Sequence, residues 1–319
     1  MRAAGALRGW PVWIAVVPVA IWALVRTLGL EGGQAVPLLA FTPYVALASL
    51  PLAGLALAFR NWPAAVLGGA AALCLAVAVL PRAIDRADAV PSSGDGATRI
   101  DVLSSNVYFG RGDARQLRDL VERLHIDLLT VQELTPQFDR ELRAAGIGRL
   151  LPHSVIRVED GASGGGIYSR WPARELAPGV EYGFRQPRAE LRLPGSQRIR
   201  VADVHPYVPT GSPRRWEDSL DGLPSTGGGA PWILAGDFNA TLDHAVLRDV
   251  ISRGYRDAGA VAGSGLVPTW PEGRTLPPLI TIDHILADER LEIADYGTEA
   301  IDGSDHRAVW AQLRLPLEP

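Results

Sequence analysis

The sequence has 319 residues, of which 47% are hydrophobic, so it is longer than one average domain and unusually apolar for a soluble protein. All 31 basic residues are Arg, and the chain beyond residue 87 carries 25 of them against 33 acidic residues, a net charge of −8 that disfavours non-specific binding to nucleic acid. The single cysteine, Cys74, excludes an intrachain disulfide.

Three apolar blocks open the chain, and they predict transmembrane helices at about residues 12–29, 36–59 and 64–81. Each block approaches the roughly 17 to 25 residues that a helix needs to cross a bilayer. Trp10, Trp13 and Trp62 lie near the block ends, where amphipathic rings favour the membrane interface. Buried helices of a soluble domain would show a polar stripe, and a cleaved signal peptide would not be followed by two more apolar blocks. We therefore predict a multi-pass membrane domain over residues 1–84.

The Arg residues that flank these blocks do not decide the orientation of the chain in the membrane. Three lie on each side, with Arg2, Arg8 and Arg60 on one and Arg26, Arg82 and Arg86 on the other. The short turn at 60–63 and the N-terminal arm are typical of cytoplasmic segments. We therefore predict a cytoplasmic N-terminus and an extracytoplasmic C-terminal domain.

Residues 85–98 are rich in Pro, Ser, Gly and Asp and predict a flexible linker before a globular domain at 99–319. The domain begins with a predicted strand, a helix over 114–124 and a second strand. Further strand-like runs follow, namely "GGGIYSR", "AELRLPG", "QRIRVADVHPYV", "PWILAGDF", "TIDHILAD" and "RAVWAQLRL". Many strands with few short helices predict an α/β fold of two packed sheets flanked by helices.

Polar residues end or interrupt several of these apolar runs. They are Asn106, Glu133, His205, Asp237, Asn239, Asp283, Asp305 and His306. Taken singly, an Asn here is most often a turn cap, a Glu a solvated strand end, and a His a hydrogen-bonded structural residue. Taken together they form a set suited to chemistry, because side chains at the ends of buried strands are held rigidly and still face a cleft.

The residue types in this set indicate a magnesium-assisted reaction on phosphate. Mg²⁺ prefers carboxylate oxygens and is often held by one or two of them, a need that Glu133 and Asp305 meet. The absence of clustered Cys or a His-x-x-x-His spacing argues against zinc. Phosphoester hydrolysis also requires a base for water and donors for the phosphate oxygens, which Asp237, the His and the Asn residues supply.

The ordered motifs "SSNV", "VQEL", "GGGIYSRWP", "VADVHPY", "LAGDFNAT", "PTWP", "TIDHILAD" and "GSDHRAV" resemble the endonuclease/exonuclease/phosphatase superfamily. This group includes DNase I, abasic-site endonucleases, inositol-polyphosphate phosphatases and neutral sphingomyelinases. The resemblance covers about residues 99–316. It implies a four-layered α/β sandwich, DNase I-like, with two central sheets and helices outside.

The resemblance also implies roles for the metal-binding and nucleophile-activating residues. Glu133 resembles the principal ligand of Mg²⁺, for which Mn²⁺ is the alternative ion, and Asn106 lies beside it in the metal and phosphate site. Asp237 resembles the residue that orients or deprotonates the attacking water, and Asn239 the donor that holds phosphate or the nucleophile. Asp305 would support a metal or the nucleophile.

The two histidines take the remaining roles implied by the resemblance. His205 matches the His that contacts the scissile phosphate. His306 matches the second active-site His, and Asp283 the carboxylate that fixes its tautomer and favours its cationic form. One departure is Tyr108, because some nucleases of the group have an acidic ligand at this position. The departure favours a site that depends on Glu133 over a two-metal scheme.

Three other features have structural interpretations. "SGGGIYSR" lacks the Gly-Lys-Ser/Thr ending of a phosphate loop and predicts a strand whose glycines allow close backbone approach. His284 follows Asp283 and points to the opposite face of the strand, which predicts a structural role. Trp270 fits the lining of a cleft and a core position equally well.

We predict a membrane-anchored, Mg²⁺-dependent phosphoesterase whose partners are the lipid bilayer and a phosphorylated lipid or cell-envelope substrate. Nucleic acid is the less favoured substrate, because the domain is acidic and lacks an Arg-rich insertion. The architecture also resembles the actinobacterial membrane proteins linked to teicoplanin resistance, the VanJ-like group, which implies a cell-wall lipid carrier phosphate or pyrophosphate. The alternatives are an extracytoplasmic nuclease using the same site and a catalytically inactive binding or sensor domain.

Overall fold

The computed structural model describes residues 10–84, 97–179, 182–273 and 277–316. Contacts divide the chain into two compact units, residues 1–81 with 242–245 and residues 82–241 with 246–319. Residues 85–96 of the predicted linker lie outside the described residues, as do Arg2 and Arg8, which entered the prediction of orientation.

The first unit is helical. Its elements are α2 (Trp10–Leu28), the 3₁₀ helix η1 (Gly33–Phe41), α3 (Thr42–Ala58) and α4 (Trp62–Val79), followed by the 3₁₀ turn η2 (Leu80–Ala83), where the second unit begins. Small residues let these helices approach closely, as where Ala56 and Ala64 pack against Val12 and Val16. Three stretches are long and apolar enough to cross a membrane, namely Trp10–Leu28, Ala35–Ala58 and Trp62–Ala83. The described part of the chain thus has three candidate membrane-spanning helices.

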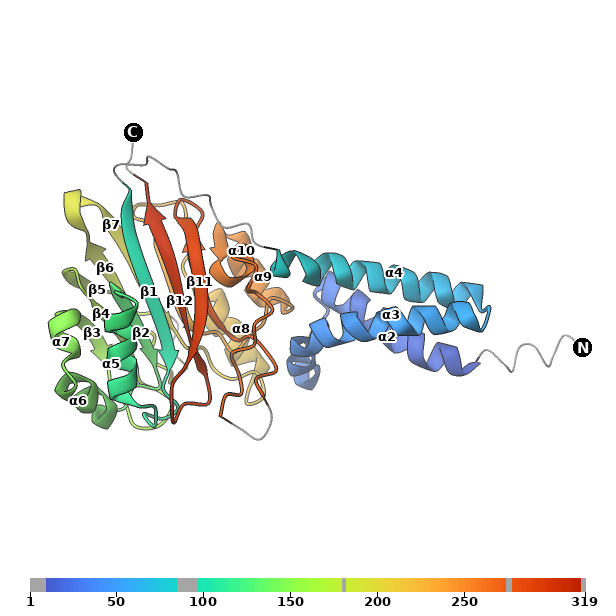
Figure 1. Cartoon of the computed structure of the whole chain (residues 1–319), viewed down its shortest axis with the longest axis horizontal. Coiled ribbons are helices and arrows are strands. Elements are labelled where there is room, and N and C mark those ends of the chain that lie inside the picture. The colour runs from blue at the N-terminus through green and yellow to red at the C-terminus, as the bar shows by residue number, and fades with distance from the viewer. Residues whose placement is uncertain (1–9, 85–96, 180–181, 274–276, 317–319) are drawn as a thin grey trace, which may run out of the picture. The chain divides into compact units, whose positions relative to one another are not determined.

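The second unit contains two six-stranded mixed sheets (Figure 1). The first has the order β11-β12-β1-β2-β4-β3 and the second β5-β6-β7-β8-β10-β9. The strands of the first sheet are β1 (Thr98–Asn106), β2 (Leu128–Gln132), β3 (His153–Arg157), β4 (Gly165–Ser169), β11 (Glu292–Ala300) and β12 (Arg307–Leu315). Those of the second are β5 (Ala173–Leu176), β6 (Arg188–Arg192), β7 (Arg198–Val204), β8 (Trp232–Asp237), β9 (Tyr255–Asp257) and β10 (Asp283–Asp288).

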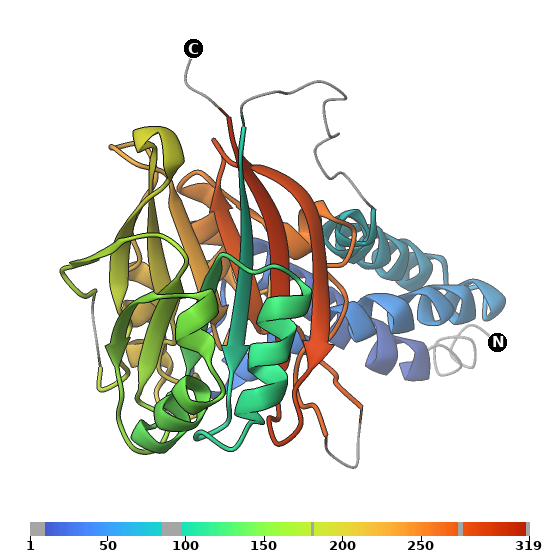
Figure 2. The same cartoon turned by 60° about the vertical axis from the view of Figure 1, so that its left-hand side comes forward.

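Apolar side chains on both faces of the sheets build the layers. Ile100 and Val102 of β1 belong to a core that also contains Val201 and Ile233 of the second sheet, whereas Leu103 belongs to a separate core with α5 and α6. The helices outside the sheets are α5 (Ala114–Arg123), α6 (Pro136–Ala144), α7 (Ile147–Leu150), α8 (Pro213–Asp221), α9 (Ala245–Ser252) and α10 (Ala258–Val261). This arrangement, seen again in Figure 2, confirms the predicted α/β sandwich.

Each strand predicted from the sequence is present, but β3, β5, β9 and β11 were not predicted. The missed strands lie at or next to the sheet edges. β9 has only three residues, and β11 alternates weakly because it contains Gly297 and several acidic residues. Such strands are defined by their pairing with a neighbour more than by their own apolar pattern.

The topology brings functional side chains to one end of the sandwich. Each sheet has one parallel pair, β1 with β2 and β7 with β8. The carboxyl ends of parallel strands meet at the same edge of a sheet. β10 runs antiparallel to β8, so its first residue, Asp283, lies opposite the last residue of β8, Asp237.

The glycines at the start of β4 allow the close approach that the sequence predicts. A Cβ on Gly164 would lie 2.0 Å from the carbonyl oxygen of Leu134, and one on Gly166 would lie 2.6 Å from the Leu134 side chain. The Gly164 carbonyl accepts a bond from the Leu134 amide at 3.1 Å. Because Leu134 directly follows Glu133, this contact fixes the chain at a predicted site residue.

We expect Gly164→Ala to destabilise the second unit by about 1–3 kcal/mol, since the new methyl group overlaps backbone that has no room to move. The melting temperature of the purified protein in detergent, followed by intrinsic fluorescence, measures this. Gly228→Ala is the control, because a Cβ at Gly228 would meet nothing within 4 Å. Equal melting temperatures for both variants would contradict the expected overlap.

Candidate active site

The candidate site lies where the parallel strands end. Asn106 is the last residue of β1, Glu133 follows β2, His205 follows β7 and Asp237 ends β8. Asp305 and His306 directly precede β12, and Asp283 begins β10. All of these side chains are buried, whereas Asn239 is partly exposed.

Asn106 joins the two sheets at the centre of the site. Its Nδ2 donates to Glu133 Oε1 at 3.2 Å and to Asp237 Oδ2 at 3.1 Å. The first acceptor belongs to the same sheet as Asn106 and the second to the opposite sheet. One amide group therefore holds two carboxylates that would otherwise repel each other in a region of low dielectric constant.

Glu133 is held in a strained conformation. Its φ is 59°, in the left-handed region that costs a residue with a side chain about 1–2 kcal/mol. Its Oε2 accepts a hydrogen bond from the Phe109 amide at 2.6 Å. Burial raises the pKa of Glu133 to about 7, although the bonds from Phe109 and Asn106 act in the opposite direction. A nearby cation would restore the ionised carboxylate.

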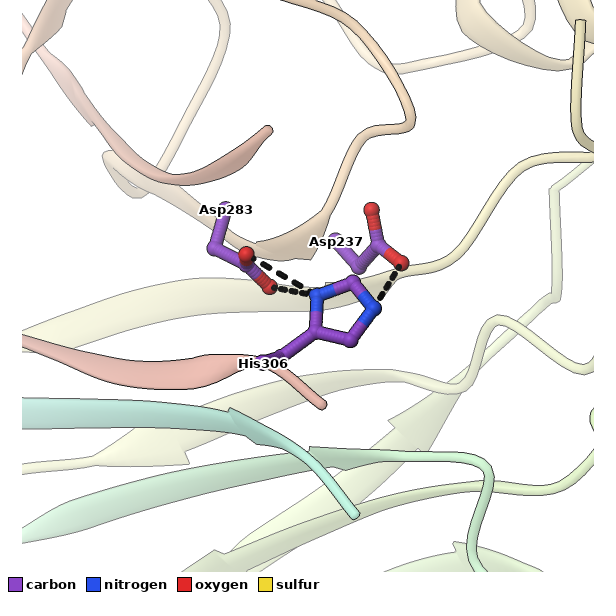
Figure 3. Close-up of side chains that lie close together, drawn as sticks. All are labelled: Asp237, Asp283 and His306. Atoms are coloured by element: carbon purple, nitrogen blue, oxygen red, sulfur yellow. Dashed lines mark hydrogen bonds and ion pairs between the residues drawn. The ribbon is translucent and has the colours of Figure 1, made fainter. Parts of the chain in front are cut away.

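His306 lies between two aspartates, as Figure 3 shows. Its Nδ1 is 3.0 Å from Asp283 Oδ2, and its Nε2 is 3.7 Å from Asp237 Oδ2. Burial lowers the pKa of His306, but Asp283 and Asp237 raise it more, and the resulting pKa is about 10. The imidazole is therefore cationic at neutral pH and offsets part of the negative charge of the site.

The protonation state of His205 at neutral pH differs from that of His306. Burial lowers its pKa to about 4, so the ring is neutral. Its Nε2 lies 3.7 Å from Asp237 Oδ2 and 3.9 Å from Glu133 Oε1, and its ring meets Phe184 edge-on at a centroid distance of 4.9 Å. The site thus pairs one cationic and one neutral imidazole with the same carboxylate.

The turn after β8 holds Asp237 in place. The amide of Asn239 donates to Asp237 Oδ1 at 2.8 Å, and the Asn239 side chain donates to the Pro206 carbonyl at 3.4 Å. Asn239 has a φ of 49°, a conformation that Asn adopts more readily than most residues. Burial raises the pKa of Asp237, which makes this carboxylate a stronger base than an exposed aspartate.

Two groups of residues are candidates for holding a metal ion. Asp237, Asp283 and His306 each offer one ligand atom, and these atoms lie within 4.8 Å of one another. An imidazolium has no lone pair for a cation, however, and Asp283 already accepts from His306. The oxygens of Glu133 and Asp237, with Asn106 between them, therefore suit a hard divalent cation better. Asp305 lies farther along the site, with its Oδ1 3.9 Å from His306 Nε2.

The structure brings all eight predicted site residues into one connected cluster, although their individual roles stay predictions. It also adds a support that sequence reasoning did not identify as part of the site. His284 Nδ1 lies 2.8 Å from Asp257 Oδ2, and its Nε2 lies 2.9 Å from the Ala240 carbonyl. Both neighbours are acceptors, so both ring nitrogens must carry protons. Burial lowers the pKa of His284, but Asp257 more than offsets this and raises it.

Comparisons with known proteins show similarity in sequence pattern and in fold. The model of the Endonuclease/Exonuclease/phosphatase family matches residues 103–306. TDP2 of D. rerio in complex with a single-strand DNA product is 18% identical and has a TM-score of 0.55, covering 68% of this chain and 99% of that chain. A mannosyl-6-phosphatase of Bacteroides thetaiotaomicron is 17% identical with a TM-score of 0.53, covering 67% of this chain and 99% of that chain.

The catalytic domain of human Nocturnin with a bound sulfate anion is 18% identical and has a TM-score of 0.52, covering 67% of this chain and 94% of that chain. At these identities the likeness to the solved structures shows the fold alone. A search of curated proteins found no match to the sequence.

We expect His284→Phe to lower kcat on the order of 10- to 100-fold, as loss of an outer partner of a site commonly does. The change leaves the Ala240 carbonyl and the Asp257 carboxylate without their donor and loosens the turn that carries Asp237 and Asn239. Steady-state kinetics, with the melting temperature measured in parallel, test this.

His153→Phe, on β3, is the matched control. His284→Gln should recover part of kcat, because its amide can donate to the Ala240 carbonyl. If kcat is normal in folded His284→Phe, the turn does not depend on this support.

Proposed function

Because the chain belongs to the endonuclease/exonuclease/phosphatase family, we propose that it is a membrane-anchored, Mg²⁺-dependent hydrolase of a phosphoester or pyrophosphate bond in a lipid or cell-envelope substrate. The observation that carries this proposal is the hydrogen-bonded cluster in which Asn106 joins Glu133 to Asp237. The cluster combines a cation site, a base and two imidazoles of different charge.

Each residue has a part in the proposed reaction. Asp237 orients the attacking water and accepts its proton, since its raised pKa favours proton transfer. The neutral His205 donates a hydrogen bond to a phosphate oxygen. The cationic His306, held by Asp283, stabilises the negative charge that develops on the phosphoryl group. Asn239 holds the water or a phosphate oxygen beside Asp237.

Glu133 would bind the metal, with Asn106 beside it shaping the site through its bonds to both carboxylates and Asp305 supporting the metal from the His306 side. When bound, Mg²⁺ would polarise the phosphate and neutralise its charge. Mn²⁺ is the alternative ion, because it takes the same oxygen ligands as Mg²⁺.

A lipid or envelope substrate is supported by the three candidate membrane spans and by the acidic character of the globular part. The resemblance to the VanJ-like group points to a cell-wall lipid carrier phosphate or pyrophosphate, with the hydrolase domain outside the membrane. A nuclease is the second candidate, because a solved structure of the same fold contains a single-strand DNA product. An inactive sensor is disfavoured by the complete set of buried polar residues.

Release of phosphate or nucleotide tests the proposal. The detergent-solubilised full chain is incubated with Mg²⁺ and a polyprenyl pyrophosphate, a phospholipid, or single- or double-stranded DNA. We expect turnover of the lipids and its loss in Asp237→Asn, which should fold normally. Turnover confined to DNA would establish the nuclease, and no turnover of any of these substrates would revive the sensor domain.

A separate prediction concerns the metal. We expect Glu133→Gln to weaken Mg²⁺ binding at least tenfold and to regain part of its activity at high Mg²⁺, because the amide keeps an oxygen ligand but loses the charge. In the wild type, protonation of Glu133 below its pKa of about 7 competes with the cation, so apparent Mg²⁺ affinity should fall about tenfold per pH unit below 7.

Activity measured against Mg²⁺ concentration between pH 5.5 and 8 gives the apparent Mg²⁺ affinity of each protein and the dependence of this affinity on pH. Glu141→Gln, an exposed carboxylate on α6, is the control. Two results together would show that Glu133 is not part of the metal site. Added Mg²⁺ would fail to restore the activity of Glu133→Gln, and the Mg²⁺ affinity would depend on pH in the same way in Glu133→Gln and Glu141→Gln.

A further inference from the structure

Five aromatic residues lie beside residues of the candidate active site, and we call them the aromatic rim. They are Tyr108, Phe109, Phe184, Tyr207 and Trp270. Phe184 packs edge-on against His205 at 4.9 Å and against Tyr207 at 5.3 Å between ring centroids. Trp270 lies 6.5 Å from the His306 ring and donates to Asp305 Oδ2 at 3.4 Å. All five keep solvent-exposed surface.

The loop after β1 presents two of these rings from an unfavourable backbone conformation. Tyr108, Phe109 and Gly110 have φ values of 46°, 53° and 70°. Gly110 is explained by space, since a Cβ there would lie 2.3 Å from Thr135 Oγ1. The left-handed conformation would cost Gly or Asn less at the other two positions. At those two positions the conformation directs the backbone amides toward the site, where Tyr108 donates to Asn106 Oδ1 at 3.0 Å and Phe109 to Glu133 Oε2 at 2.6 Å.

Burial in the core does not explain why an aromatic residue occupies position 109. Its side chain is 41% exposed, the largest value among the large apolar residues described within 97–316. The Phe109 amide meanwhile donates to Glu133, so the ring is fixed to the predicted metal site through its own backbone. The amide contacts account for the backbone, and the exposed ring that they leave beside the reaction centre is available for contact with a ligand.

Two arginines stack on rim rings in the loops after β1 and β7, which belong to opposite sheets. The Arg111 guanidinium lies over Tyr108 at 5.0 Å and over Phe109 at 5.8 Å, and Arg215 lies over Tyr207 at 5.6 Å. No carboxylate among the described residues pairs with either guanidinium. Stacking restricts the rings before any ligand arrives, which lowers the entropic cost of binding.

We propose that the aromatic rim binds the hydrocarbon chain of a lipid phosphate, so that the substrate is selected by the apolar group attached to the scissile phosphate. This inference rests on the proposed function. A chain is favoured over a nucleobase because the globular part is acidic and the same protein carries three candidate membrane spans. Apolar contact with the rim adds binding free energy. A further negative group on the substrate would instead be repelled by the acidic domain.

The test compares substrates that share a headgroup and differ in chain length, farnesyl pyrophosphate and dimethylallyl pyrophosphate, with a thymidine dinucleotide as the third arm. Full-length protein in nanodiscs is assayed for kcat/KM with Mg²⁺. The affinities of the methylene-bridged analogues of both lipids are measured by calorimetry in the Asp237→Asn background. The rim variants are Phe109→Asn, which suits a positive φ, and Tyr207→Ser; Val158→Asn, at a residue of similar exposure outside the rim, is the control.

We expect the wild type to prefer the farnesyl compounds and each rim variant to lower this preference roughly tenfold in kcat/KM and in affinity, while Val158→Asn keeps it. A chain-length preference that survives both rim variants would overturn the inference. A rim-dependent preference for the dinucleotide would replace the chain with a base. Rim-dependent binding of the farnesyl analogue without hydrolysis of either lipid would uphold the inference and refute the proposed function.

Discussion

The structure depends on the burial of four carboxylates at one end of a two-sheet sandwich. Glu133, Asp237, Asp283 and Asp305 are each at most 8% exposed. Removing an unpaired carboxylate from water costs several kcal/mol, so the fold must supply compensation. It does so through the Asn106 amide, which serves two of the carboxylates, and through the His306 imidazolium, which lies between Asp283 and Asp237. The remaining excess of negative charge is what a divalent cation would neutralise.

The backbone around these groups is as constrained as the charges. Glu133 and Asn239 occupy the left-handed region at the ends of β2 and β8, one in each sheet. Neither conformation would persist alone, because each costs free energy that neighbouring contacts must offset. Glu133 is supported by the Phe109 amide, and the turn at Asn239 by the carbonyl contact of Ala240 with His284. The left-handed conformations therefore set the positions of the reactive side chains, and contacts with neighbouring residues offset their cost in free energy.

The central strands and the site residues could be predicted from the sequence because both are marked by the way a buried strand ends. A buried strand such as β8 is an apolar run that stops at a polar residue, and Asp237 is that residue. Supports that depend on pairing between strands left no such signal. His284 and Asp257 are 27 residues apart and meet only because β9 pairs with β10. Phe184 likewise reaches His205 from a loop outside any strand. Long-range pairing decides these contacts, and local pattern does not record it.

In the proposed reaction, the charge of the site and the character of its rim would divide the work of binding. A bound cation would reduce the repulsion between the substrate phosphate and the four buried carboxylates. Once the metal is bound, the phosphate contacts are the same for every phosphoester, and they distinguish substrates poorly. Discrimination must then come from what is attached to the phosphate, where binding free energy from a remote group can also align the reacting centre. Phe109 connects these two requirements in one residue, because its amide positions Glu133 and its ring faces solvent at the edge of the same site.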